Sequence, residues 1–212
     1  TMEINKFCEK IIRDAAATPS FLNLYGFPGA VCTSINEVVV HGIPDHRKLK
    51  DGDIISVDVG ACYKGYHGDS AWTYAVGQIS DDAAHLMKVT EEALYAGLAQ
   101  VKPGNRLSDI SHAVQTYLEN HGCSTPRDYT GHGIGTKVHE DPAVPNYGAP
   151  GKGPRLKEGM TLAIEPMAHL GRCETDVLDD DWTVVTRDRS LAAHYEHTIV
   201  ITSDGYEILT KL

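Results

Sequence analysis

Two aspartates lie in an otherwise apolar stretch at residues 56–71, SVDVGACYKGYHGDSA. β-Forming residues on both sides of a turn predict that this stretch folds as a hairpin. With a two-residue turn at Tyr63 and Lys64, residues whose numbers sum to 127 oppose each other, so Asp58 faces Asp69; a slightly different loop keeps both carboxylates on one face. Like charges opposed across a hairpin are destabilising, and a cation between them reverses that effect. The alternative is a pair of solvated surface acids.

The second half of the chain contains more side chains of metal-binding types. His132 and His139 lie in the glycine-rich GHGIGTKVHEDP, where the backbone can approach a ligand closely. Glu165 ends a predicted strand in LAIEP, and Glu196 precedes the apolar strand of HYEHTIVIT. Taken alone, each is readily explained as a core histidine or an edge-strand acid. Together, two Asp, two Glu and a His form an oxygen-rich set with too many carboxylates for one structural zinc.

Such a set suits Mn(II), Fe(II), Co(II) or Zn(II), and four carboxylates balance the charge of two divalent ions. Two ions about 3.5–4 Å apart can activate water and stabilise a hydrolytic transition state. The residue types therefore predict a hydrolase with a dinuclear site.

An internal repeat predicts how these residues are positioned. HGIPDHRKLKDGDIISVDVG and YGAPGKGPRLKEGMTLAIEP align Gly52 with Gly159 and Asp58 with Glu165, unless the similarity between the two loop-strand units is due to chance. Helical patterns at residues 1–17 and 107–122 precede the two passages. We therefore expect one domain, residues 1–212, with two related α/β halves at about 1–79 and 80–212.

A third helical pattern, at residues 80–103, has no counterpart before Thr1. Its apolar positions have helical spacing, and it lies between a Ser-Asp cap and a Pro-Gly stop. We therefore expect that an N-terminal helix is missing from this chain or has been removed.

Composition narrows the class of protein. The chain has 212 residues, 42% of them hydrophobic, which allows a sizeable core. Its five cysteines are an odd number without a CxxC pair, which indicates reduced thiols in the cytoplasm. No apolar run is long enough to span a membrane and no signal-peptide pattern opens the chain. The net charge of -10 argues against nucleic acid as the main partner.

The chain resembles the type I methionine aminopeptidases over essentially its whole length. The resemblance rests on VCTSINEVVVHGIP, VDVGACYKGYHGDSA, TGHGIGTKVHEDP, TLAIEPM and DRSLAAHYEHTIVIT. It implies the α+β pita-bread fold, with two pseudo-symmetric halves, antiparallel sheet and helices on the outside. It also implies removal of the N-terminal methionine from nascent proteins and peptides, preferably when the second residue is small. The partners would be the N-termini of nascent polypeptides, and the ribosome is a further candidate. We expect the protein to be a monomer.

The same resemblance implies roles for individual residues. Five side chains would bind two divalent ions (Co²⁺, Mn²⁺, Fe²⁺ or Zn²⁺): Asp58, Asp69, His132, Glu165 and Glu196. Asp69 and Glu196 would bridge the ions. Glu165 would also accept a proton when water attacks the carbonyl, His139 would stabilise the oxyanion, and His41 would contact the scissile amide.

The methionine pocket is expected at Phe27, Cys32 and Trp182, because soft and aromatic groups favour contact with a thioether. The chain departs from the family pattern at Leu24, where a Tyr is usual, and at Val138, where a Phe is usual. Both changes remove aromatic surface from the pocket. Six other histidines are expected to be helix-surface or supporting residues: His67, His112, His121, His169, His194 and His197.

Two other functions remain open at this stage. Prolidases and Xaa-Pro aminopeptidases share the fold and similar ligands but have an extra N-terminal domain for which this chain has no room. Some pita-bread proteins have lost their metals and act as binding modules, which the complete set of five ligands disfavours. Creatinase-like hydrolysis is disfavoured too, because it proceeds on this scaffold without a dinuclear site.

Overall fold

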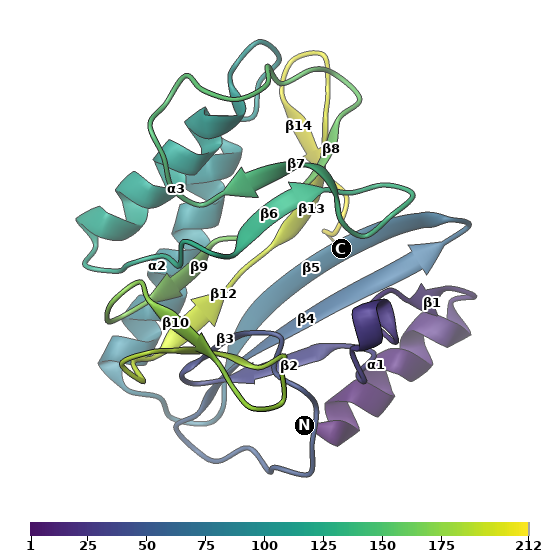
Figure 1. Cartoon of the computed structure of the whole chain (residues 1–212), viewed down its shortest axis with the longest axis vertical. Helices are drawn as coiled ribbons and strands as arrows, with labels where there is room; N and C mark the ends of the chain where they lie inside the picture. The colour runs from purple at the N-terminus through teal and green to yellow at the C-terminus, as the bar shows by residue number, and fades with distance from the viewer. Residues whose placement is uncertain (212) are drawn as a thin grey trace.

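The computed structural model describes residues 1–211 as a mixed α/β chain with antiparallel sheets (Figure 1). Its helices are α1 (Met2–Asp14), α2 (Asp81–Leu98), α3 (Leu107–Asn120) and the short 3-10 helix η1 (Leu24–Gly26). Its strands are β1 (Thr18–Pro19), β2 (Cys32–Ile35), β3 (Val38–Val40), β4 (Ile54–Tyr63), β5 (Tyr66–Ala75), β6 (Thr130–Gly133), β7 (Glu140–Pro145), β8 (Thr161–Ile164), β9 (Met167–His169), β10 (Thr175–Val177), β11 (Val184–Thr186), β12 (Ala192–His194), β13 (His197–Ile201) and β14 (Tyr206–Ile208). No helix in residues 1–211 is both long and apolar enough to cross a membrane.

The helices form where apolar spacing and capping residues predict them. Ser80 caps α2: its Oγ accepts a hydrogen bond from the Ala83 backbone N–H at 3.2 Å, and two aspartates occupy the first turn. α3 begins with a similar device, because the Asp109 carboxylate accepts from the Arg106 N–H at 2.7 Å. All three long helices are therefore confirmed close to their predicted bounds.

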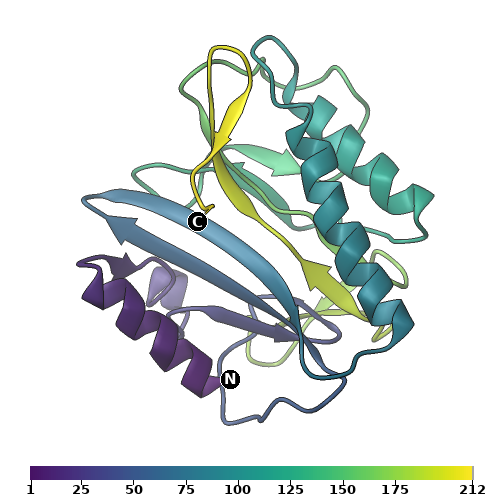
Figure 2. The ribbon, with the colours of Figure 1, turned by 180° about the vertical axis from the view of Figure 1, so that it is seen from behind.

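Two sheets carry most of the strands. One contains β1, β4 and β2 in that order with β5 paired to β4, and the other has the order β14-β13-β8-β6-β7. Helices α2 and α3 run beside the second sheet, whereas α1 lies next to β1 and β4 at the other end of the molecule (Figures 1 and 2). The main core fills the space between α2, α3 and the second sheet, with fully buried Leu86, Leu94, Ile110, Leu162 and Ile199. The helices thus pack on the outer side of the strands, and the inner side of the strands remains free to carry a site.

The β4–β5 hairpin has a different register from the predicted one. Tyr63 pairs with Tyr66, so the turn consists of Lys64 and Gly65, with φ angles of 51° and 85°. Two consecutive positive φ values define the turn type that matches the twist of a hairpin, and glycine adopts such angles most readily. Direct opposition of the two aspartates is therefore wrong.

The two aspartates are diagonal neighbours. Asp58 pairs with Ala71, and Asp69 pairs with Gly60. Because side chains alternate along a strand, both carboxylates still point to one face. The electrostatic conflict predicted from the sequence thus remains in the folded hairpin.

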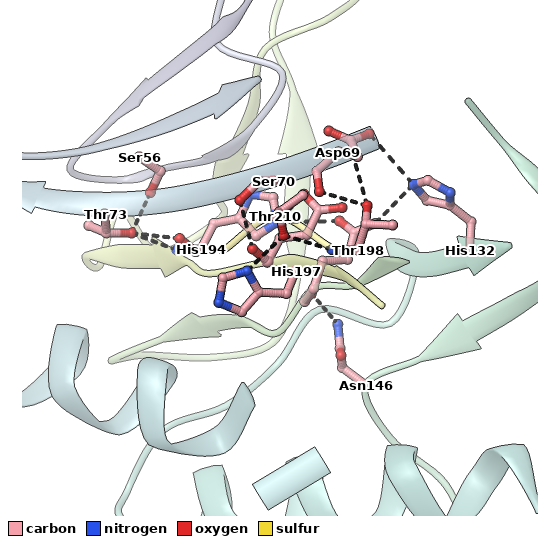
Figure 3. A network of polar contacts seen from close by, with 12 residues as sticks. Ser56, Asp69, Ser70, Thr73, His132, Asn146, His194, His197, Thr198 and Thr210 are labelled. Atoms are coloured by element: carbon pink, nitrogen blue, oxygen red, sulfur yellow. Dashed lines mark hydrogen bonds and ion pairs between the residues drawn. The ribbon is translucent and has the colours of Figure 1, made fainter. Parts of the chain in front are cut away.

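Side-chain hydroxyls join β5 to the segment that contains β12 and β13. Thr198 Oγ1 accepts from the Asp69 N–H at 2.9 Å and donates to the Asp69 carbonyl at 2.8 Å (Figure 3). Thr73 Oγ1 makes the same pair of bonds with His194, accepting from its N–H at 3.0 Å and donating to its carbonyl at 2.8 Å. We call these four bonds, made by two threonines, the threonine junction. It holds the first sheet against β13 of the second sheet and against β12, at the level of the carboxylates.

Replacing Thr73 with Val should destabilise the protein. Valine has nearly the same shape but leaves the buried N–H and C=O of His194 without partners, at about 1–3 kcal/mol for each group. We expect Thr73→Val to lower the free energy of unfolding in urea by roughly 2–4 kcal/mol. The control is Thr175→Val, at a partly exposed position in β10. Equal losses in the two variants would show that the threonine junction contributes little.

Candidate metal centre

A cavity of about 870 Å³ opens between the two sheets. All ten residues predicted from the sequence line it: Phe27, Cys32, His41, Asp58, Asp69, His132, His139, Glu165, Trp182 and Glu196. They come from positions far apart in the chain and share no helix. The structure therefore brings the whole predicted set together in one place.

The five predicted ligands come from both sheets. Asp58 lies on β4, Asp69 on β5 and His132 on β6. Glu165 directly follows β8, and Glu196 lies between β12 and β13. Strand backbones hydrogen-bonded on both sides move little, so they position side chains more accurately than free loops do.

The glycine-rich motif allows β6 to fit between its neighbours. A Cβ atom added at Gly131 would lie 2.4 Å from the carbonyl oxygen of Ala163, and one at Gly133 would lie 2.3 Å from that of Asp141. Neither contact is possible for a larger residue without movement of the backbone. The glycines thus bring His132, which lies between them, close to the carboxylates of the other strands.

Atoms of metal-binding type converge at the floor of the cavity. His132 Nε2 is 3.5 Å from Glu165 Oε1. It is also 3.9 Å from Asp69 Oδ2 (Figure 3). One possible ligand group consists of Asp69, His132 and Glu196, with ligand atoms within 4.8 Å of one another. A second group consists of Glu165, His194 and Glu196. Glu196 belongs to both groups, as expected of a residue that bridges two ions.

Several carboxylate oxygens at this floor have no partner among the described residues. Asp58 Oδ1, Asp69 Oδ1 and Glu196 Oε1 are each buried without a hydrogen bond. Buried anionic oxygens are costly unless they are paired, hydrogen-bonded or bound to a metal. Divalent cations supply the missing interaction, and the mixed oxygen and imidazole donors suit them. These residues therefore fit a divalent metal centre.

The pKa values of these acids also show that burial and mutual repulsion disfavour their charged form. Burial, together with Glu165, raises the pKa of Asp69 to about 7. Burial also raises the pKa of Glu165 to about 7, and His132 opposes that shift. Burial and repulsion by neighbouring carboxylates raise the pKa of Asp58 and Glu196 well above the ordinary range. Without a cation, the cluster therefore keeps protons that isolated carboxyl groups would lose near pH 4.

His41 and His139 lie on the wall of the same cavity. His41 follows β3 and has a φ of 59°, an uncommon angle for a residue with a side chain. Burial lowers its pKa to about 4, so its imidazole is neutral at pH 7. His139 lies at the exposed rim with its ring 4.6 Å from that of His132, and partial burial with His132 nearby lowers its pKa as well. Each ring can therefore donate one N–H.

An apolar compartment adjoins the carboxylates. Phe21, Phe27, Cys32 and Val138 form a buried cluster, with Trp182 packed against it. The rings of Phe27 and Trp182 meet edge to face at 5.1 Å. Leu24 also packs here, so both departures from the family pattern affect this compartment. Its aromatic rings and its thiol suit contact with a flexible thioether chain.

Sequence reasoning allowed His194 a helix-surface or a supporting role and missed that it lies beside Glu165. Its side chain is only 2% exposed and its Nε2 lies 3.3 Å from Glu165 Oε2, so it is not a surface residue. The available signal was its spacing from Glu196, because residues two apart on an extended segment share a face. Tyr25 was also missed; it is 79% exposed and stacks on His139 at 6.3 Å, at the mouth of the cavity.

Known proteins similar to this chain agree with the site. Residues 1–203 match the model of metallopeptidase family M24. Methionine aminopeptidase 1 of Bacillus subtilis (strain 168) is 58% identical over 212 residues, which cover 100% of this chain and 86% of that relative. The crystal structure of methionine aminopeptidase from Thermotoga maritima has a TM-score of 0.98 and 47% identity, covering 100% of this chain and 85% of that one. Xaa-Pro dipeptidase from Bacillus anthracis has a TM-score of 0.78 and 25% identity, covering 100% and 52%.

The chain belongs to metallopeptidase family M24. Within that family it is similar at high identity to methionine aminopeptidases. Its pita-bread fold is confirmed by the superposition on these structures. Membership of a metallopeptidase family implies divalent metal binding, in agreement with the unpartnered oxygens.

Metal-free protein should lose stability as pH rises from 6.5 to 8. The folded pKa of Asp69 and Glu165, about 7, lies above the unfolded value near 4, so deprotonation through this range favours the unfolded chain. The histidines with lowered pKa act in the opposite direction around their unfolded pKa near 6.5 and offset part of this loss, whereas Asp58 and Glu196, whose pKa is raised further, add to it. Each carboxyl group should contribute about 1 kcal/mol, or roughly 2–4 °C in melting temperature.

Differential scanning calorimetry with a chelator measures this slope, and saturating Mn(II) should abolish it. Asp69→Asn should reduce the slope, whereas Asp179→Asn, at an exposed turn, should leave it unchanged. A melting temperature independent of pH in the metal-free protein would contradict the charge conflict.

Proposed function

We propose that this chain is a metal-dependent aminopeptidase that removes the N-terminal methionine from nascent proteins and peptides, preferably when the second residue is small. The observation that carries the proposal is a cluster of unpartnered carboxylates directly beside an apolar compartment. The similarity to methionine aminopeptidases over the full chain supports it. The apolar compartment would recognise the methionine side chain, and the carboxylates would hold the metal ions that hydrolyse the peptide bond.

The metal centre we propose contains two divalent ions, from among Mn²⁺, Fe²⁺, Co²⁺ and Zn²⁺. The ligands would be Asp58, Asp69, His132, Glu165 and Glu196, with Asp69 and Glu196 bridging. Sharing of Glu196 between the two groups of converging ligand atoms supports its role as a bridge, whereas Asp69 belongs to one group and Asp58 to neither. When bound, the ions supply an activated water and polarise the scissile carbonyl. Which metal is used in the cell depends on supply as well as affinity.

The protein side chains position the substrate and move its protons. Glu165 is placed to accept a proton from the attacking water, because it lies at the floor of the cavity beside the other proposed ligands. The neutral His139 would donate an N–H to the oxyanion, a contact of a few kcal/mol in such sites. His41, on the same wall, would hydrogen-bond the scissile amide and help the leaving nitrogen.

The methionine side chain would occupy the apolar compartment. Phe27 and Trp182 provide aromatic edges, and Cys32 lies at the end nearest the carboxylates, because it pairs with Asp58 between β2 and β4. A thioether makes favourable contacts with aromatic rings and sulfur. The leaving chain would extend toward the mouth, where space near the reacting bond decides which second residue fits.

We expect the enzyme to act in the cytoplasm as a monomer, on chains at or near the ribosome. The five cysteines make no disulfide, which suits a reducing compartment. An Xaa-Pro peptidase remains the second candidate because a solved Xaa-Pro dipeptidase shares the fold, at lower identity. A metal-free binding role does not account for the unpartnered oxygens of the carboxylates.

Purified protein loaded with Co(II) or Mn(II) should release Met from Met-Ala-Ser and leave Xaa-Pro dipeptides intact. Product analysis by chromatography over a panel of both peptide classes measures this preference. Cleavage of Xaa-Pro bonds without release of Met would overturn the substrate assignment.

The same assay separates the ligands from surface acids. Asp69→Asn should lower Met release by at least about 100-fold, because it removes a bridging ligand, and the losses for residues merely supporting a ligand are already 10- to 100-fold. Asp179→Asn is the matched control and should retain full activity.

A further inference from the structure

Glu165 is contacted by a histidine at each carboxylate oxygen. His132 Nε2 lies 3.5 Å from Oε1, and His194 Nε2 lies 3.3 Å from Oε2. His132 belongs to the proposed ligand set, whereas His194 has no role in it. A carboxylate that must both bind an ion and accept a proton depends on its orientation, so the second histidine bears on the chemistry.

The backbone of His194 is held on both sides. On one side, the threonine junction binds its N–H and C=O through Thr73, whose hydroxyl also contacts Ser56 Oγ at 2.8 Å (Figure 3). On the other side, β12 pairs with β9 so that His194 is opposite Met167, two residues after Glu165. His194 is thus tied to a ladder that begins two residues after the acid, which limits how far the two can separate.

The imidazole of His194 has a polar atom with no other partner. Its Nε2 is buried and makes no hydrogen bond to any described residue. The two nearest acidic oxygens are Glu165 Oε2 at 3.3 Å and Glu196 Oε2 at 4.0 Å. Buried polar atoms are seldom left unsatisfied, and catalytic hydrogen bonds that are long before loading often shorten when the site is filled. Glu165 is therefore the partner that the geometry offers.

We propose that His194 is a positioning residue of the metal centre: its Nε2–H donates to Glu165 Oε2 and leaves Oε1 to face the ion. This inference rests on the proposed function, because it assigns Glu165 a metal. The hydrogen bond fixes the plane of the carboxylate and withdraws one oxygen from competition for the ion. Residues that support ligands in this way typically change metal affinity 10- to 100-fold when they are replaced.

Two substitutions separate the donor from the bulk of the side chain. In His194→Gln, the amide nitrogen reaches nearly the same place as Nε2 and can still donate; His194→Leu keeps an apolar chain of similar size without a donor. His46→Leu is the control, at an exposed position outside the cavity. Far-UV circular dichroism and thermal melting check that each variant is folded.

Isothermal titration of metal-free protein with Co(II) is the main readout. His194→Leu should weaken binding roughly 10- to 100-fold, and His194→Gln should remain within about threefold of the parent. In Met-Ala-Ser hydrolysis at saturating metal, His194→Leu should lower kcat with little change in KM, because the substrate contacts are elsewhere. Parent-like affinity in His194→Leu would overturn the proposal, and equal weakening in both variants would overturn the donor role.

The parent protein provides a test that survives a folding failure of the variants. Nitrogen-15 NMR of histidine-labelled, Zn(II)-loaded protein should show the His194 imidazole with its proton on Nε2. A metal-bound or unprotonated Nε2 would contradict the proposal. Failure to release Met would overturn the proposed function alone, since the affinity series and the tautomer are measured without substrate.

Discussion

The structure depends on a balance between repulsion and cation binding at one buried point. Asp58, Asp69, Glu165 and Glu196 meet where two sheets join, and three of these acids have an oxygen without any partner in the described chain. Such a cluster is stable with protons at low pH or with divalent ions at neutral pH. The same feature that strains the metal-free chain therefore provides the affinity for metal, and with it the hydrolytic chemistry.

The threonine junction makes this arrangement mechanically possible. Thr198 and Thr73 bind backbone groups of Asp69 and His194, so β5 is joined to β13 and to β12 next to the acids that repel one another. Strands from both sheets contribute ligands, and the apolar compartment beside them is built from Cys32 of β2 and from loops that contain Phe27 and Trp182. Hydrolysis and recognition of a thioether side chain thus both depend on the threonine junction, and a movement of the joined strands would disturb both.

Much of this was predictable from the sequence because the signals are local. Helices α1, α2 and α3 follow from apolar spacing and caps, and the metal-binding residue types stand in recognisable motifs. The hairpin register was wrong because the turn moved by one residue to Lys64 and Gly65, a choice set by backbone angles. The position of His194 depends on pairing between distant strands, and the positive φ of His41 depends on packing, so neither follows from local pattern.

The central claim is that the unpartnered carboxylates are one dinuclear metal centre. Anomalous scattering from crystals grown with Mn(II), collected on both sides of the manganese absorption edge, tests it most directly. The account predicts two peaks about 3.5–4 Å apart at the floor of the cavity, with Asp69 and Glu196 contacting both. A single peak, or peaks bound elsewhere with the four carboxylates left free, would contradict it.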